Sequence, residues 1–153
     1  MKQTAKDKEN AETDSLRRML EEVLDGQQFK LIELTVSRHK GSVQVRAVIY
    51  NGKSISIDDC SKVHRAILPR LELAFPQQDI YLEVSSPGID RLIKDKDEFA
   101  HYTGRTVRCY RTDISDWTAG ILLSAGEEGI VLQTKDAELE LKFGIIAKAK
   151  LAN

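Results

Sequence analysis

The chain has 153 residues, of which 41% are hydrophobic and 31% charged, and its formal net charge at pH 7 is -1. This composition predicts a folded chain with one domain or two small ones and excludes a disordered one. A net charge near zero also excludes attraction of nucleic acid by the field of the whole molecule, so any such attraction must come from local patches.

The chain is expected to begin with a disordered tail over residues 1–13, because this stretch has almost no large apolar side chains to bury. From Asp14 onward, apolar residues recur three and four positions apart and predict an amphipathic helix that ends at Gly26. The two segments that follow, 30–38 and 42–50, alternate apolar and polar residues. They predict a β-hairpin with one solvent-exposed face.

A second helix is expected to begin after Ser56, which stands three residues before Asp59 in a pattern that resembles a capping box. Its apolar stripe comprises Ile57, Cys60, Val63, Ile67, Leu71 and Ala74. Pro69 predicts a kink or a restart in this helix, because proline removes a backbone hydrogen bond. A strand over residues 79–86 completes the order αββαβ over residues 14–92, so we expect a small sheet with helices on one face.

Residues 93–153 are expected to form a second domain that is all-β. A short helical piece over residues 97–102 stops at Gly104, and short alternating segments then follow one another. The candidate strands are residues 106–111, 117–124, 129–134, 138–143 and 146–150. Five short strands favour a small barrel, because an open sheet of this size would leave unprotected edges. The predicted fold class is therefore α+β.

The most informative stretch is LEVSSPGIDR, residues 82–91. Pro87 fixes one backbone torsion and Gly88 can adopt a positive φ, so the chain must turn sharply beside two serine hydroxyls. Such a turn can expose amide groups to an anion, and lysine and arginine side chains follow it. One interpretation is a phosphate contact by Ser85, Ser86, Gly88, Arg91 and Lys94. The other is a capped turn between two domains.

The start of the second domain adds further basic residues. Arg105, Arg108 and Arg111 recur at intervals of three, so they do not share one face of a regular strand, and Arg105 is assigned to the preceding turn. Arg105 and Arg108 are candidate RNA contacts, with an ordinary solvated surface as the alternative. Trp117 either stacks on a base or anchors the core of the barrel.

Cys60 and His64 are four residues apart on the second predicted helix and thus share one face, a spacing that admits a Cys-His nucleophile. Cys60 also lies on the apolar stripe, where a thiol behaves as a small hydrophobic group. Two cysteines do not make a disulfide framework or a zinc site, and no membrane span or secretory signal is apparent. We expect a cytoplasmic protein without metal or cofactor.

The stretch 82–91, together with ISIDDCSKVHRAI at residues 55–67, resembles the bacterial ribosome maturation factor RimP family. The likeness covers nearly the whole chain and extends through the segments 97–102 and 104–107. The chain departs from the family pattern at Leu92, where the family usually has proline. It departs again at Tyr50 and Asn51, where aspartate is common in the family.

The resemblance implies a non-enzymatic assembly factor that promotes maturation of the small (30S) ribosomal subunit. Such a factor binds the RNA of the immature subunit and a ribosomal protein, has no catalytic residue and takes no small-molecule substrate. The resemblance also implies that the second domain is an Sm-like or SH3-like barrel, and that residues 85–91 lie at or beside the contact. A free-standing RNA-binding barrel protein and a Cys-His enzyme remain as alternatives.

Overall fold

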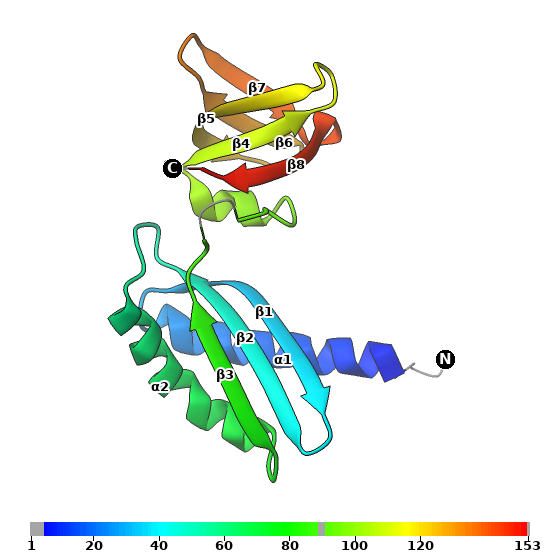
Figure 1. Cartoon of the computed structure of the whole chain (residues 1–153), viewed down its shortest axis with the longest axis vertical. Coiled ribbons are helices and arrows are strands. Elements are labelled where there is room, and N and C mark those ends of the chain that lie inside the picture. The colour runs from blue at the N-terminus through cyan, green and yellow to red at the C-terminus, as the bar shows by residue number, and fades with distance from the viewer. Residues whose placement is uncertain (1–4, 89–90, 153) are drawn as a thin grey trace. The chain divides into compact units, whose positions relative to one another are not determined.

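A computed structural model describes residues 5–88 and 91–152, with side chains from residue 11 onward. The chain divides into two compact units between Pro87 and Gly88. Figure 1 shows both long helices in the N-terminal unit and a strand-rich C-terminal unit. The predicted α+β class and the αββαβ order of the first unit are confirmed.

The N-terminal unit has helices on one face of a three-stranded sheet. Its elements are α1 (Ala5–Asp25), β1 (Lys30–His39), β2 (Ser42–Tyr50), α2 (Ile57–Ala74) and β3 (Asp79–Ser85). The strand order is β1-β2-β3, with β1 antiparallel and β3 parallel to β2. Alternate residues of β2 pack against the apolar stripes of both helices, and the core includes Leu20, Leu24, Val43, Ala47, Ile49, Val63, Ile67 and Leu71. The predicted hairpin with one exposed face is therefore present.

Helix α1 begins at Ala5, so the residues expected as a tail are helical from there on. Alanine, lysine and glutamate favour a helix in this stretch, and the apolar face that starts at Leu16 anchors it to the sheet. Glu12 forms an ion pair with Arg38 of β1. The Arg38 guanidinium lies in turn 5.0 Å from the ring centroid of Phe75. These contacts join the first helix to the sheet and to the end of α2.

Helix α2 starts with the predicted capping box. The Asp59 N–H donates to Ser56 Oγ at 3.0 Å, and the Ser56 N–H donates to Asp59 Oδ2 at 2.9 Å. The helix then runs through Pro69 without interruption, so the predicted restart is wrong. Ile67 and Leu71, on either side of the proline, are completely buried. Burial of two such side chains stabilises by about 1.5–3 kcal/mol each, enough to offset the cost of about 3 kcal/mol for proline inside a helix.

The C-terminal unit contains the five predicted strands. Its elements are the 3-10 helix η1 (Glu98–Tyr102), β4 (Thr106–Arg111), β5 (Asp116–Ala125), β6 (Gly129–Gln133), β7 (Glu138–Lys142), the 3-10 helix η2 (Phe143–Ile145) and β8 (Ile146–Leu151). The strands form one antiparallel sheet in the order β7-β6-β5-β4-β8. Figure 1 shows this sheet curling round on itself. Within the described residues no pairing joins β7 to β8, so the strand ladder is open at that point.

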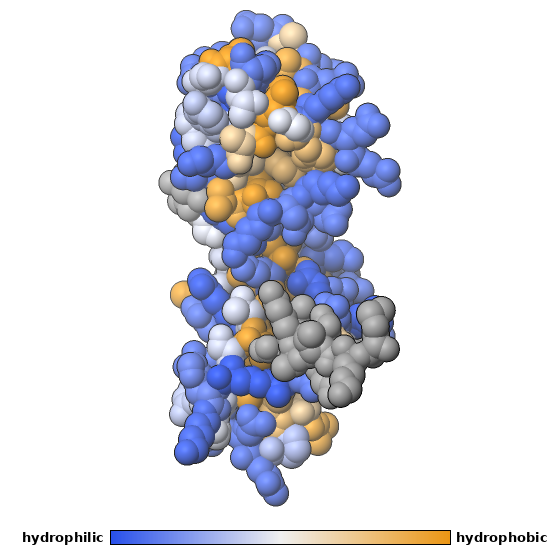
Figure 2. Space-filling model, turned by 90° about the vertical axis from the view of Figure 1, so that its right-hand side faces the viewer, coloured by the Kyte–Doolittle hydropathy of each residue, from blue (hydrophilic) through white to orange (hydrophobic). Residues whose placement is uncertain are grey.

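The side of the molecule drawn in Figure 2 is largely hydrophilic, with smaller apolar areas between the hydrophilic residues. In the described part of the chain, no helix has the length and apolar character needed to cross a membrane.

Candidate nucleic-acid interface

The Ser-Ser-Pro-Gly turn leaves the end of β3. Ser85 is the last residue of that strand, lies opposite Val48 of β2 and is half-buried, whereas Ser86 and Gly88 are exposed. Gly88 does not adopt the positive φ that the sequence allowed, and open space surrounds it. The Arg91 N–H donates to the Gly88 carbonyl at 3.1 Å, which closes the turn. Residues 89 and 90 of the predicted stretch lie outside the described residues.

Arg91, predicted as a phosphate contact, takes part in a buried ion pair. Its Nε lies 2.9 Å from Glu98 Oε2, and a terminal guanidinium nitrogen lies 3.0 Å from Glu98 Oε1. The side chains of Arg91 and Glu98 are only 11% and 4% exposed. Tyr102 donates its hydroxyl to Glu98 Oε2 at 2.8 Å. The pKa of Tyr102 is well above its ordinary value, because burial and the hydrogen bond to Glu98 both favour the neutral phenol.

This cluster positions the segment that carries Lys94. The Lys94 N–H lies 3.4 Å from Glu98 Oε1, and the Glu98 N–H donates to Asp95 Oδ1 at 2.9 Å. Just before Lys94, the Ile93 N–H donates to the Ala149 carbonyl, so the segment runs along the edge of β8. The Lys94 side chain is exposed. Glu98 therefore holds the backbone of the Lys94 segment, and the lysine side chain remains at the surface.

Arg105 lies in the turn before β4, as predicted. The turn requires Gly104, whose φ of 90° lies in the left-handed region. The Arg105 N–H donates to the Tyr102 carbonyl, and the Arg105 carbonyl accepts from the Leu122 N–H, each at 2.9 Å. The Arg105 side chain is half-buried.

Arg108 belongs to a larger cationic surface that the sequence did not reveal. We call the side of β4, β5 and β8 that points away from the core the outer face. On it Arg108 lies directly opposite Lys150 of β8, and Tyr110 lies opposite Lys148 on one side and Trp117 on the other. The outward positions of these described strands carry no acidic residue: Thr106, Arg108, Tyr110, Trp117, Ala119, Ile121, Lys148 and Lys150. Only the strand register brings these lysines beside Arg108.

Trp117 lies on this outer face and does not anchor the core. It is half-buried, and the Arg108 guanidinium carbon is 5.1 Å from the centroid of its ring. The Tyr110 ring meets it nearly edge-on, with centroids 5.5 Å apart and an interplanar angle of 74°. Tyr110, Lys148 and Lys150 were not among the predicted site residues, and for Trp117 stacking on a base was one of two alternatives. The alternation of inward and outward residues along β4 and β8 is the sequence signal that could have placed these residues on one face.

Cys60 and His64 both line a groove between α2 and β3, together with Ile57, Ser61, Arg65, Leu82, Glu83 and Val84. The pKa of the Cys60 thiol is raised, first by partial burial and then by the negative charge of Asp59. A catalytic cysteine requires the opposite shift, because its thiolate is the nucleophile. The raised pKa of Cys60 therefore argues against its use as a nucleophile.

In the native chain Cys60 is expected to react with iodoacetamide more slowly at about pH 8 than in the urea-unfolded chain, because its raised pKa leaves less thiolate. The rate should rise with pH through the ordinary thiol range and beyond it. Peptide mass spectrometry checks this, with buried Cys109, whose pKa burial raises to about 11, as the internal reference. Faster alkylation of native Cys60 would revive the enzyme interpretation.

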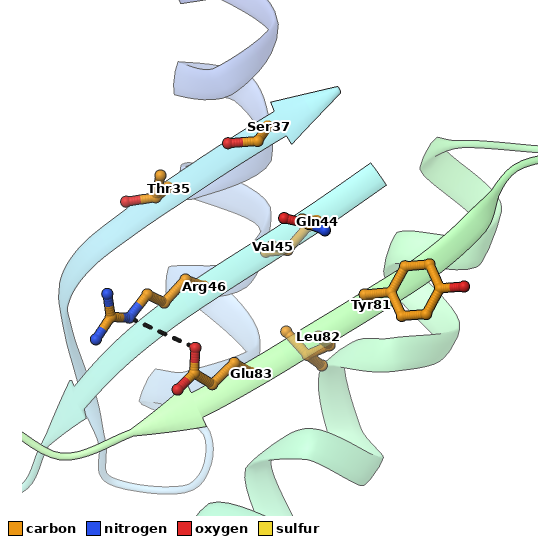
Figure 3. A pocket seen from close by; sticks show the side chains of 8 residues that line it. All are labelled: Thr35, Ser37, Gln44, Val45, Arg46, Tyr81, Leu82 and Glu83. Carbon is orange, nitrogen blue, oxygen red and sulfur yellow. Dashed lines mark ion pairs between the residues drawn. The ribbon is translucent and has the colours of Figure 1, made fainter. Parts of the chain in front are cut away.

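The solvent-exposed face of the N-terminal sheet holds an open depression (Figure 3). Its polar lining comes from Thr35 and Ser37 of β1, Gln44 and Arg46 of β2, and Tyr81 and Glu83 of β3. Arg46 Nε lies 3.6 Å from Glu83 Oε2, and both side chains are more than half exposed. The only cation of this lining is thus paired with an acid.

Comparisons with known proteins agree with the resemblance seen in the sequence. Residues 19–90 match the family model of the RimP N-terminal domain. The chain is 30% identical over 134 residues to a protein named ribosome maturation factor RimP from Borrelia hermsii, an alignment that covers 88% of this chain and 92% of that protein. It is 28% identical, with the same coverage, to the protein of that name from Borrelia turicatae.

Proposed function

Because the chain belongs to the RimP family of ribosome maturation factors, we propose that it promotes maturation of the small (30S) ribosomal subunit in the cytoplasm. It binds the RNA of the immature subunit and a ribosomal protein and holds them in a productive arrangement. It makes and breaks no covalent bond.

The observation that supports RNA binding most directly is that two positively charged residues are cross-strand neighbours on the outer face. Arg108 and Lys150 lie directly opposite each other across β4 and β8, and Lys148 is exposed on the same face. Like charges in this position destabilise a sheet. A phosphate group between them removes the repulsion and releases bound counterions. The arrangement therefore favours an anionic partner.

The proposal assigns further contacts to the remaining predicted residues of each unit. Lys94 and Arg105 supply further phosphate contacts, and Ser85, Ser86 and Gly88 offer hydroxyl and amide groups to RNA or to the ribosomal protein. Arg91 acts indirectly, because its guanidinium contacts Glu98, which also holds the backbone of Lys94. Only residues with an accessible side chain or backbone group are assigned to direct contact.

Binding of the full chain to purified immature small subunits tests this function. The logarithm of the binding constant should fall linearly with the logarithm of the salt concentration. Each of Lys94→Ala and Lys150→Ala should reduce the slope by about 1, since each removes one phosphate contact. Lys142→Ala, which removes an exposed lysine on β7, is the matched control and should leave the slope unchanged.

Two outcomes would contradict the proposal. Equal binding to mature and immature subunits would remove the maturation role, and a salt-independent affinity would remove the phosphate contacts.

A further inference from the structure

We propose that the outer face of the C-terminal sheet binds unpaired RNA by stacking a nucleobase against the Trp117–Arg108 pair. This inference rests on the proposed function and specifies its RNA partner as a single-stranded segment. It assigns the aromatic residues of the face to the bases and the lysines of β8 to the phosphates.

The position of Trp117 is the first argument. A large aromatic side chain contributes most to stability when it is buried, yet Trp117 is only half-buried while smaller residues fill the core of the unit. Arg108 and Tyr110 hold the ring in place at centroid distances of 5.1 and 5.5 Å. Both the cation–π contact and the edge-on aromatic contact are attractive, so they favour one position of the ring. The stacking surface is therefore ordered before any base arrives.

The chemistry around the ring is the second argument. Lys148 lies opposite Tyr110, and Lys150 lies opposite Arg108, so cations flank the aromatic pair along β8. Leu92 pairs with Lys150 at the outer edge of β8 and is 46% exposed, and Ile121 on β5 is 45% exposed. The face thus combines positive charge with flat and apolar surfaces. Single-stranded nucleic acid carries the matching groups, phosphates and unstacked bases, on one chain.

The third argument separates unpaired RNA from other anions. A double helix presents phosphates, but its bases are stacked on one another and cannot reach an aromatic side chain on a protein. An acidic peptide would match the lysines and leave the rings without a planar partner. Only an unpaired strand uses both parts of the face, because each base has an aromatic surface.

Trp117 is the only tryptophan of the chain, so its fluorescence reports directly on this site. The full chain is titrated with single-stranded oligoadenylate and oligouridylate of about ten nucleotides, a length within the range that such proteins cover. Saturable quenching is expected with both, and a duplex of equal length should quench little. Arg108→Ala should weaken the quenching, whereas Lys142→Ala on β7 should leave it unchanged.

A labelled oligonucleotide measures the affinity of variants that lack the tryptophan. Trp117→Leu should raise the dissociation constant about 5-fold to 150-fold, the range for loss of one stacked base, while Trp117→Tyr should retain most of the affinity. Circular dichroism checks that both variants fold. If Trp117→Leu does not fold, Arg108→Ala and the comparison with duplex still decide the question.

The results separate this inference from the function on which it rests. Absence of quenching, with salt-dependent binding to immature subunits intact, would overturn the stacking site alone. Equal quenching by duplex RNA or by polyglutamate would overturn it as well, because the aromatic pair would then add no selectivity. Failure to bind immature subunits, with quenching by single strands intact, would instead contradict the maturation role and leave an RNA-binding surface.

Discussion

Glu98→Ala is expected to lower the free energy of unfolding of the C-terminal unit by about 3–5 kcal/mol, the cost of removing one partner from a buried ion pair. The substitution leaves the Arg91 guanidinium, which is 11% exposed, without the carboxylate that two of its nitrogens contact. It also removes the acceptor of the Tyr102 hydroxyl. Urea denaturation followed by Trp117 fluorescence measures the loss, because Trp117 reports on this unit.

Two further variants show whether the buried charge is the cause. Replacing both partners, Arg91→Met with Glu98→Leu, should recover much of the stability, since no unpaired charge then remains in the interior. Asp113→Ala removes the partner of Arg111 in a pair whose carboxylate is 37% exposed, against 4% for Glu98, and should have a smaller effect. If Glu98→Ala were no worse than Asp113→Ala, the buried cluster would not stabilise the unit.

Gly129→Ala is expected to destabilise the C-terminal unit by about 1–3 kcal/mol or more, the usual range for overpacking. A Cβ at this position would lie 2.2 Å from the Leu141 carbonyl oxygen and 2.9 Å from the Lys142 Cα. Both atoms belong to the backbone of β7, so β6 and β7 would have to separate where they pair. Chemical denaturation, again followed by Trp117, measures the loss.

Gly144→Ala is the matched control within the same unit. A Cβ there has no neighbour within 4 Å, and the residue does not have a positive φ. Alanine should therefore be neutral or slightly stabilising, because it lowers the entropy of the unfolded chain. Equal losses for the two substitutions would show that close approach of β7 does not explain the glycine at position 129.

Most of the fold could be predicted from local pattern. Two-residue alternation identified the hairpin and the strands of the C-terminal unit, because it follows the two faces of a strand. The capping box placed the start of α2 at Ser56 for a similarly local reason. The restart predicted at Pro69 was wrong, because the burial of Ile67 and Leu71 depends on the sheet beneath them. Gly129 was predicted as the first residue of a strand, but the close approach of β7 to it was not, because that approach depends on the pairing of β6 with β7.

The candidate site was predicted less completely, and Arg91 and Trp117 show why. A cation next to a turn suggested a phosphate contact, but the partner of Arg91 is Glu98, which the interior of the unit places beside it. The sequence left two roles open for Trp117. The orientation of β5 places this residue outside the core, next to Arg108.

The amino-acid sequence by itself determined the order of helices and strands, the α+β class and the resemblance to the RimP family, because these depend on short-range periodicity and on motifs of consecutive residues. Only the tertiary structure decided which charged side chains form ion pairs in the interior and which lie side by side at the surface. Arg91 is held by Glu98, while Arg108 lies opposite Lys150, remote in sequence. Pairing of distant strands creates these neighbours, and no local pattern encodes the register of that pairing.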